Sequence, residues 1–180
     1  MHFKHDIILR NYIYQSIYSC MNNILDKEPV IRASKALSNF DSALEIQVLD
    51  KTARTAIDAA NSLKCEVGAI VKSLLFKKDK TYLLCLVSGD KRCSLNKLKK
   101  ILNSKDVSMA SPNEVKLQTG YTIGGVSPVG HKIKLNILID ETLKEFSNIY
   151  AAAGHPNCVF KTNFFDLIKL TNGKIENIIE

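Results

Sequence analysis

The sequence predicts one α+β domain with a mostly antiparallel sheet. Segments with strand-like and helix-like hydrophobic patterns alternate irregularly along the chain, without the repeated strand–helix–strand order of a parallel sheet. The apolar residues 68–76 and 81–87 flank a charged turn at residues 77–80, which is typical of an antiparallel hairpin. With 180 residues, 46% of them hydrophobic, the chain is long enough to bury one core.

Two parts of the chain are expected: an N-terminal extension over residues 1–25 and one folded domain over residues 26–180. Residues 1–25 show no clear hydrophobic period, as expected of a segment that is disordered or foreign to the native protein. We hypothesise that Met21 is the biological start of the chain. The intact mass of the natively expressed protein tests this hypothesis, and a full-length mass would contradict it.

Helix starts are predicted from capping residues and proline positions. Pro29 suits a first helical position and begins a helix expected to end near Phe40. Ser111 and Glu114 form a capping box ahead of a helix expected to stop at Gly120. Other helices are expected after the capping residues Thr52, Ser94, Asp140 and Asn163. Besides the hairpin, strands are expected over residues 44–49, 133–139, 149–153, 158–161 and 174–179.

Basic charge is concentrated in the middle of the chain. The formal net charge is +7, and residues 72–105 contain ten Lys or Arg against Asp79 and Asp90. Such a surface favours a polyanion such as RNA as partner. The alternative is a solvated lysine-rich face that keeps a small protein soluble.

Cysteine usage points to a reducing compartment. The five cysteines are odd in number, irregularly spaced and without a Cys-x-x-Cys pair, so neither a disulfide framework nor a zinc site is expected. No apolar run approaches the roughly 20 residues that cross a membrane. We therefore expect a cytoplasmic protein with no membrane contact, no metal and no cofactor.

Lys72 lies inside an otherwise apolar run, residues 67–76. Burying an unpaired ammonium costs several kcal/mol, so an interior lysine must pair, extend to solvent or serve a function. A covered strand would direct Lys72 into a cleft. The alternative is an edge strand whose lysine points to solvent.

Residues 119–131 contain four glycines and Pro128 between two periodic segments. A loop of this composition exposes backbone N–H groups, which predicts binding of a carbonyl oxygen or oxyanion, with an ordinary long turn as the alternative. No Gly-Lys-Ser/Thr follows, and the pattern does not match the dinucleotide fingerprint. His155 lies in a second glycine turn and is either a substrate contact or a surface histidine. No G-x-S-x-G sequence supports a serine hydrolase.

Several segments together resemble the YbaK/prolyl-tRNA-synthetase-associated editing-domain family. They run in the family's order over about residues 45–178 and comprise residues 52–60, 67–74, 86–92, 114–115 with 119–121, 124–130 and 152–156. Each motif is modest, but their joint occurrence is specific. The resemblance implies a mixed α+β fold around a mostly antiparallel, barrel-like sheet.

The resemblance also implies a free-standing deacylase that hydrolyses the ester of mischarged aminoacyl-tRNA. Lys72 matches the family's essential lysine, Gly124 and Pro128 match its G-x-x-x-P loop, and Gly154 matches a second loop beside the amino-acid pocket. Gly154-His155-Pro156 replaces the basic sequence of some members, which disfavours a cysteine-specific subtype. The residues expected in the site are Lys72, Gly124, Gly125, Val126, Ser127 and Pro128 for catalysis, Ser73, Ala153, Gly154 and His155 for substrate binding, and Lys91 and Arg92 for tRNA binding.

Three functions follow from these expectations. The first is trans-editing of tRNA that carries a small amino acid, Ala, Ser, Thr or Cys, with the substrate assisting its own hydrolysis and the amides of residues 125–127 stabilising the oxyanion. The second is a tRNA- or nucleotide-binding module without catalysis. The third is a regulatory protein that docks on an aminoacyl-tRNA synthetase. The sequence leaves the amino acid, the tRNA and the oligomeric state open.

Overall fold

A computed structural model describes residues 24–49, 53 and 55–180. The expected extension lies outside these residues except for its last two, and so do Met21 and the expected cap Thr52. Among the described residues, no helix has the length and apolar character required to cross a membrane.

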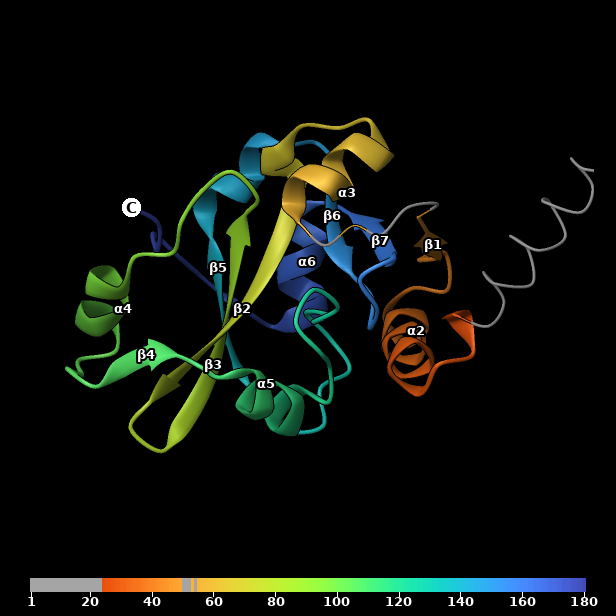
Figure 1. Cartoon of the computed structure of the whole chain (residues 1–180). Helices are drawn as coiled ribbons and strands as arrows, with labels where there is room; N and C mark the ends of the chain where they lie inside the picture. The colour runs from red at the N-terminus through yellow and green to blue at the C-terminus, as the bar shows by residue number, and fades with distance from the viewer. Residues whose placement is uncertain (1–23, 50–52, 54) are drawn as a thin grey trace, which may run out of the picture.

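One mixed sheet of eight strands forms the centre of the molecule (Figure 1). The strand order is β1-β7-β6-β2-β3-β5-β8, and β4 also pairs with β2. The β2–β3, β2–β4, β6–β7 and β1–β7 pairs are antiparallel, whereas β2–β6, β3–β5 and β5–β8 are parallel. The α+β class with a mostly antiparallel sheet is thus confirmed. The strands are β1 (Ile46–Val48), β2 (Ile70–Lys78), β3 (Thr81–Ser88), β4 (Val107–Met109), β5 (Asn136–Asp140), β6 (Ile149–Ala152), β7 (Cys158–Thr162) and β8 (Lys174–Glu176).

Most helix starts follow the predicted caps. Ser94, Ser111 and Asn163 each accept a backbone N–H at the start of a helix, and the box of Ser111 with Glu114 is complete. Thr55, rather than Thr52, caps the helix after β1. The helices are α2 (Glu28–Phe40), α3 (Ala56–Leu63), α4 (Leu95–Ile101), α5 (Pro112–Thr119) and α6 (Phe164–Thr171), with 3₁₀ turns η1 (Val67–Ala69) and η2 (Glu141–Glu145).

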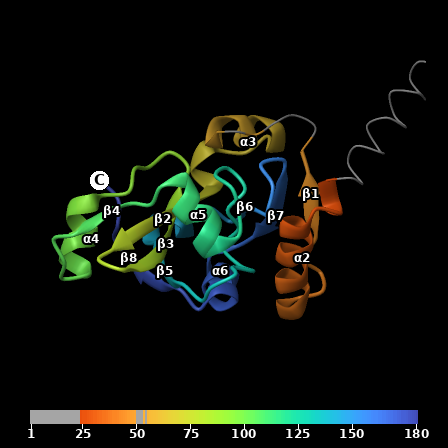
Figure 2. The same ribbon diagram turned by 60° about the horizontal axis from the view of Figure 1, so that its bottom comes forward.

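The main core lies where α2 and α6 approach the sheet (Figure 2). From α2, Val30, Ala33 and Leu37 are buried, as the apolar spacing predicts. They join Tyr121 of the glycine loop (residues 119–131) and Phe160 of β7 in one cluster. Fully burying a large apolar side chain contributes about 1.5–3 kcal/mol. This cluster therefore ties α2 to the loop after α5 as well as to the sheet.

Three local predictions differ from the structure. The strand β4 was not expected, because Val107–Met109 is only three residues long. The segment after Asp140 is a 3₁₀ turn, and the Asp140 side chain caps no backbone N–H. The last strand ends at Glu176, and Ile179 instead forms an isolated bridge with Cys93.

Candidate active site

A cavity of about 330 Å³ lies between β2 and α3, which both contribute residues to its lining. Its walls come from β2, α3, α5, β6 and the glycine loop, and most of its lining is apolar. Lys72, Ser73, Gly124 and Val126 contribute to this lining. Four residues predicted for the site are therefore brought together from segments about 50 positions apart in the sequence.

Lys72 lies on an interior strand but at a gap in the pairing on one side, because β6 pairs only with residues 70–71 and β4 only with residues 76–78. Its strand β2 pairs with β3 on one side and with β4 and β6 on the other. The half-buried side chain donates a hydrogen bond from Nζ to the carbonyl oxygen of Lys91. Desolvation lowers the pKa of Lys72, and the nearby Asp90 carboxylate partly opposes this shift. Because an ammonium has three N–H donors, two remain for a ligand.

The turn that accepts this bond is held by a serine and an aspartate. Ser88 Oγ is 2.7 Å from both the Gly68 carbonyl oxygen and Asp90 Oδ1. Asp90 Oδ2 lies 3.2 Å from Lys91 Nζ. The Arg92 side chain is exposed. Lys91 therefore meets Lys72 through its backbone, whereas its own ammonium is paired with Asp90.

Within the glycine loop, Gly124 and Val126 line the cavity, whereas Gly125, Ser127 and Pro128 do not. The Gly125 N–H donates to the Thr122 carbonyl oxygen at 2.9 Å, so it is not available as an oxyanion donor. The amides of Gly124 and Val126 have no acceptor within the part of the chain that is described. Of the 125–127 amides expected from the sequence, only that of Val126 is both unpartnered and at the cavity, and the amide of Gly124 joins it.

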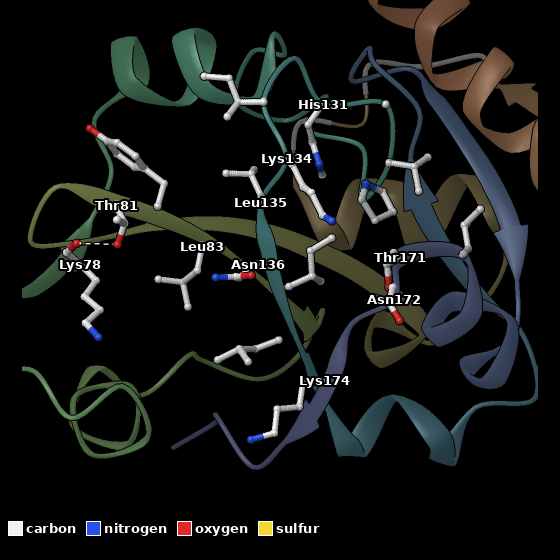
Figure 3. A pocket seen from close by; sticks show the side chains of 18 of the residues that line it. Lys78, Thr81, Leu83, His131, Lys134, Leu135, Asn136, Thr171, Asn172 and Lys174 are labelled. Carbon is white, nitrogen blue, oxygen red and sulfur yellow. Dashed lines mark hydrogen bonds between the residues drawn. The ribbon is translucent and has the colours of Figure 1, made fainter.

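Ser127 and Pro128 face away from the cavity. Ser127 is fully buried, and its Oγ accepts the Val129 N–H at 3.3 Å. Pro128 lines a second hollow of about 700 Å³ between β3, β5 and the end of α6, where Lys78, Lys134 and Lys174 also lie (Figure 3). The loop thus forms a wall of both hollows.

The second glycine turn packs directly on the first. The Gly154 N–H donates to the Gly125 carbonyl oxygen at 3.1 Å. A Cβ at Gly125 would lie 2.9 Å from the backbone of His155. Gly154 adopts a left-handed backbone with φ of +88°, which favours glycine. The two loops predicted from the sequence therefore form one contiguous unit.

Neither His155 nor Ala153 lines the cavity, and Ala153 is fully buried. The ring accepts the Asn157 N–H at Nδ1 and lies 3.3 Å from Lys27 Nζ through Nε2. Burial, together with the Lys27 charge, lowers the pKa of His155. The neighbours Ala152 and Pro156 line the cavity instead.

The family of the chain follows from a comparison of sequences. The family model described as "Aminoacyl-tRNA editing domain" matches residues 50–170. The chain belongs to the aminoacyl-tRNA editing domain family. The matched residues include both glycine loops and all of β2, so the cavity of this editing domain is built almost entirely from the shared region.

Relatives of this editing domain include stand-alone proteins and segments of much larger ones. The proline–tRNA ligase of Lactobacillus acidophilus is 34% identical over 141 residues, which is 76% of this chain but only 25% of the ligase. A candidate Cys-tRNA(Pro)/Cys-tRNA(Cys) deacylase of Enterococcus faecalis is 30% identical over 69% of this chain and 76% of its own. A solved structure described as a candidate trans-editing enzyme for prolyl-tRNA synthetase is 35% identical, with a TM-score of 0.81 over 86% of this chain and 98% of that one.

The chemical groups in the editing domain's cavity are few. Among the described residues that line it, Lys72 and Tyr150 are the only titratable ones. The Ser73 Oγ atom is buried without a hydrogen-bond partner in the described part of the chain. No cluster of three His, Cys, Asp or Glu residues suited to a metal occurs among the described residues.

Some walls of the cavity were missed by sequence reasoning. Met109, Ala110, Val115 and Tyr150 line it from β4, the link between β4 and α5, the middle of α5, and β6. Apolar residues on short elements resemble ordinary core residues, so their pattern carries no signal for a ligand. The parallel pairing of β2 with β6, which brings Tyr150 to the site, depends on contacts about 80 residues apart.

Proposed function

We propose that this editing domain is a trans-acting deacylase that hydrolyses the ester of tRNA mischarged with Ala, Ser, Thr or Cys. The observation that carries the proposal is the position of Lys72. The half-buried Lys72 lines the same apolar cavity as Gly124 and Val126, whose amides have no acceptor among the described residues. The named deacylase and trans-editing relatives support the same activity.

The proposed reaction requires only water and the substrate's own ribose. No His, Asp, Glu or Cys occurs among the described residues of the lining, so an imidazole or carboxylate base and a thiol nucleophile are not at hand there. Water attacks the ester carbonyl, and the adjacent ribose hydroxyl relays its proton to the departing ribose oxygen as the C–O bond breaks. The products are the free amino acid and a tRNA with both terminal hydroxyls.

The protein stabilises the charges of this reaction. The carbonyl oxygen becomes negative as water attacks, and the amides of Gly124 and Val126 donate to it. A well-placed donor of this kind contributes about 3–4 kcal/mol to the transition state. Lys72 uses its two remaining N–H groups to hold the terminal phosphate or ribose.

Cavity size and polarity select the amino acid. An apolar space of about 330 Å³ suits a small side chain beside the terminal ribose. One methylene alters binding by only ~1–3 kcal/mol, which explains why a synthetase makes errors that a second site must correct. The unpartnered Ser73 hydroxyl supplies one hydrogen-bonding group to a polar substrate atom.

A panel of mischarged tRNAs tests the proposal. Purified protein is incubated with Ala-, Ser-, Thr- and Cys-tRNA and with correctly charged Pro-tRNA, and the release of amino acid is followed. We expect hydrolysis of at least one of the four small substrates and sparing of Pro-tRNA. Salt-sensitive RNA binding without cleavage would instead indicate the binding module, and co-purification with a synthetase without cleavage would indicate the docking protein.

A further inference from the structure

Arg32 of α2 bonds to both ends of the glycine loop. Its Nε donates to the Gly130 carbonyl oxygen at 2.6 Å, and its second terminal nitrogen donates to the Gly120 carbonyl oxygen at 3.0 Å. The remaining terminal nitrogen pairs with Glu28 at 2.8 Å. The side chain is 19% exposed. One rigid guanidinium therefore joins two carbonyls that are ten residues apart in the chain.

Tyr121 completes the closure of the same loop. Its fully buried ring lies under Arg32, with the guanidinium carbon 4.5 Å from the ring centroid. The hydroxyl lies 2.8 Å from the Val129 carbonyl oxygen and 3.0 Å from that of Gly130. Gly130 has a φ of +69°, and a Cβ there would lie 2.7 Å from the Tyr121 oxygen. The loop ends are thus held together with no room for a side chain.

The same helix also touches the second loop. A Cβ at Gly154 would lie 2.4 Å from the Pro29 carbonyl oxygen and 2.8 Å from the Val30 nitrogen. Gly154 in turn bonds to Gly125. The first two turns of α2 therefore contact both loops beside the cavity, although α2 precedes the residues 50–170 matched by the family model.

We propose that Arg32 is a positioning residue of the deacylase, which holds the glycine loop so that the Gly124 and Val126 amides stay at the cavity. This inference rests on the proposed function. Arg32 does not line the cavity, so it acts through the loop and not on the substrate. A loop with unfixed ends would present its amides in the required orientation for only part of the time, which slows the chemical step more than it weakens substrate binding.

The test compares Arg32→Ala and Arg32→Lys with two controls. Lys35→Ala removes an exposed cation from the same helix. Glu28→Gln removes the negative charge of the 68%-exposed partner of Arg32 while leaving both loop carbonyls bonded. Two quantities are measured on the full chain. One is kcat and KM for the mischarged tRNA that the wild type hydrolyses best, and the other is hydrogen exchange of the amides in residues 120–130.

For Arg32→Ala we expect kcat to fall at least about 10-fold with KM within about 2-fold, and loop exchange to quicken at least about 10-fold. Arg32→Lys should give values of kcat and loop exchange between those of Arg32→Ala and the wild type, because an ammonium lacks the planar fork that reaches both carbonyls. Both controls should match the wild type. Unchanged kcat, a raised KM at constant kcat, or slowed turnover without faster loop exchange would each overturn the inference.

The two proposals fail in different ways. A wild type that hydrolyses none of the mischarged tRNAs would refute the deacylase, whereas an active wild type with an equally active Arg32→Ala variant would refute only the positioning role. If Arg32→Ala does not fold, Arg32→Lys carries the same comparison. For Arg32→Lys we expect a partial loss of kcat and moderately faster hydrogen exchange in the loop. Wild-type values of kcat and of loop exchange would contradict the inference.

Discussion

The Lys72 ammonium and the Lys91 carbonyl oxygen form a hydrogen bond that connects the cavity to the basic turn after β3. This bond holds the long, flexible side chain of Lys72 in one conformation. It also explains why a charged residue is tolerated in a strand interior: one N–H is satisfied by the protein, and Asp90 lies close enough to favour the charge. The lysine is thus oriented before any substrate enters.

Replacing Lys72 by Met should remove activity without unfolding the protein. The apolar stem is kept, and because desolvation already disfavours the charged form, loss of the charge should not lower the melting temperature. We expect kcat/KM for mischarged tRNA to fall at least about 100-fold, which corresponds to about 2.7 kcal/mol of transition-state stabilisation. The exposed Lys161 of β7, changed to Met, is the matched control. A Lys72→Met protein with full activity would refute the role of the ammonium.

Gly125→Ala should reduce activity by separating the two loops. Its new Cβ would lie 2.9 Å from the His155 backbone, closer than such contacts occur, so the loops must move apart. We expect a loss of kcat of at least about 10-fold. Deacylation kinetics, with circular dichroism to verify folding, measure this effect. Wild-type kcat in a folded Gly125→Ala protein would show that the close contact is not needed.

Ser127→Ala should separate stability from activity. The hydroxyl accepts the buried Val129 N–H and does not reach the cavity. Removing it leaves that N–H unpaired, at a cost of about 1–3 kcal/mol in unfolding free energy. Urea denaturation should detect this loss, while kcat at 25 °C stays within about 2-fold of the wild type. Destroyed activity in a folded variant would mean that the loop works through this side chain.

Local sequence patterns predicted the parts of the fold that depend on neighbouring residues. The capping box of Ser111 and Glu114 and the helix with Pro29 in its first turn are both present because their hydrogen bonds and φ preferences are local. Thr52 and Thr55 are equally good caps in sequence, and only the Asp58 carboxylate at the third helical position favours Thr55. The Thr-x-x-Asp spacing of Thr55 and Asp58 is the sequence signal for this cap.

The rest of the site depends on contacts that no local pattern encodes. Lys72 was predicted from its apolar surroundings, but its bond to Lys91 requires the β2–β3 register. Arg32 gave no signal, because an arginine on an amphipathic helix is ordinary and its carbonyl partners lie 88 and 98 residues away. Loop glycines indicate available backbone, but not which amides are already bonded, as with Gly125.

Acid should destabilise the protein in part through Glu114. The backbone hydrogen bond from Ser111, followed by side-chain hydrogen bonds from Tyr82, Lys77 and Ser111, lowers the pKa of Glu114 from 4.5 to about 2. A lowered carboxyl pKa means stability that is present above pH 4.5 and is lost as the pH falls toward 2. Glu114→Gln should therefore lower the melting temperature at pH 7 and show a smaller decrease over this window. Melting temperatures that fall equally with pH in Glu114→Gln and in the wild type would contradict this prediction.

Arg92→Ala should weaken tRNA binding in a salt-dependent manner. Arg92 is exposed next to Lys91, whose ammonium is paired with Asp90 at 3.2 Å, so Arg92 is the freer cation of this turn. If it contacts one phosphate, its loss should reduce the slope of log K against log[salt] by about 0.7–0.9. Binding of uncharged tRNA measured between low and moderate salt gives this slope independently of catalysis. Lys161→Ala, an exposed cation on β7, serves as the control. Equal slopes for Arg92→Ala and the wild type would place the RNA contact elsewhere on the basic surface.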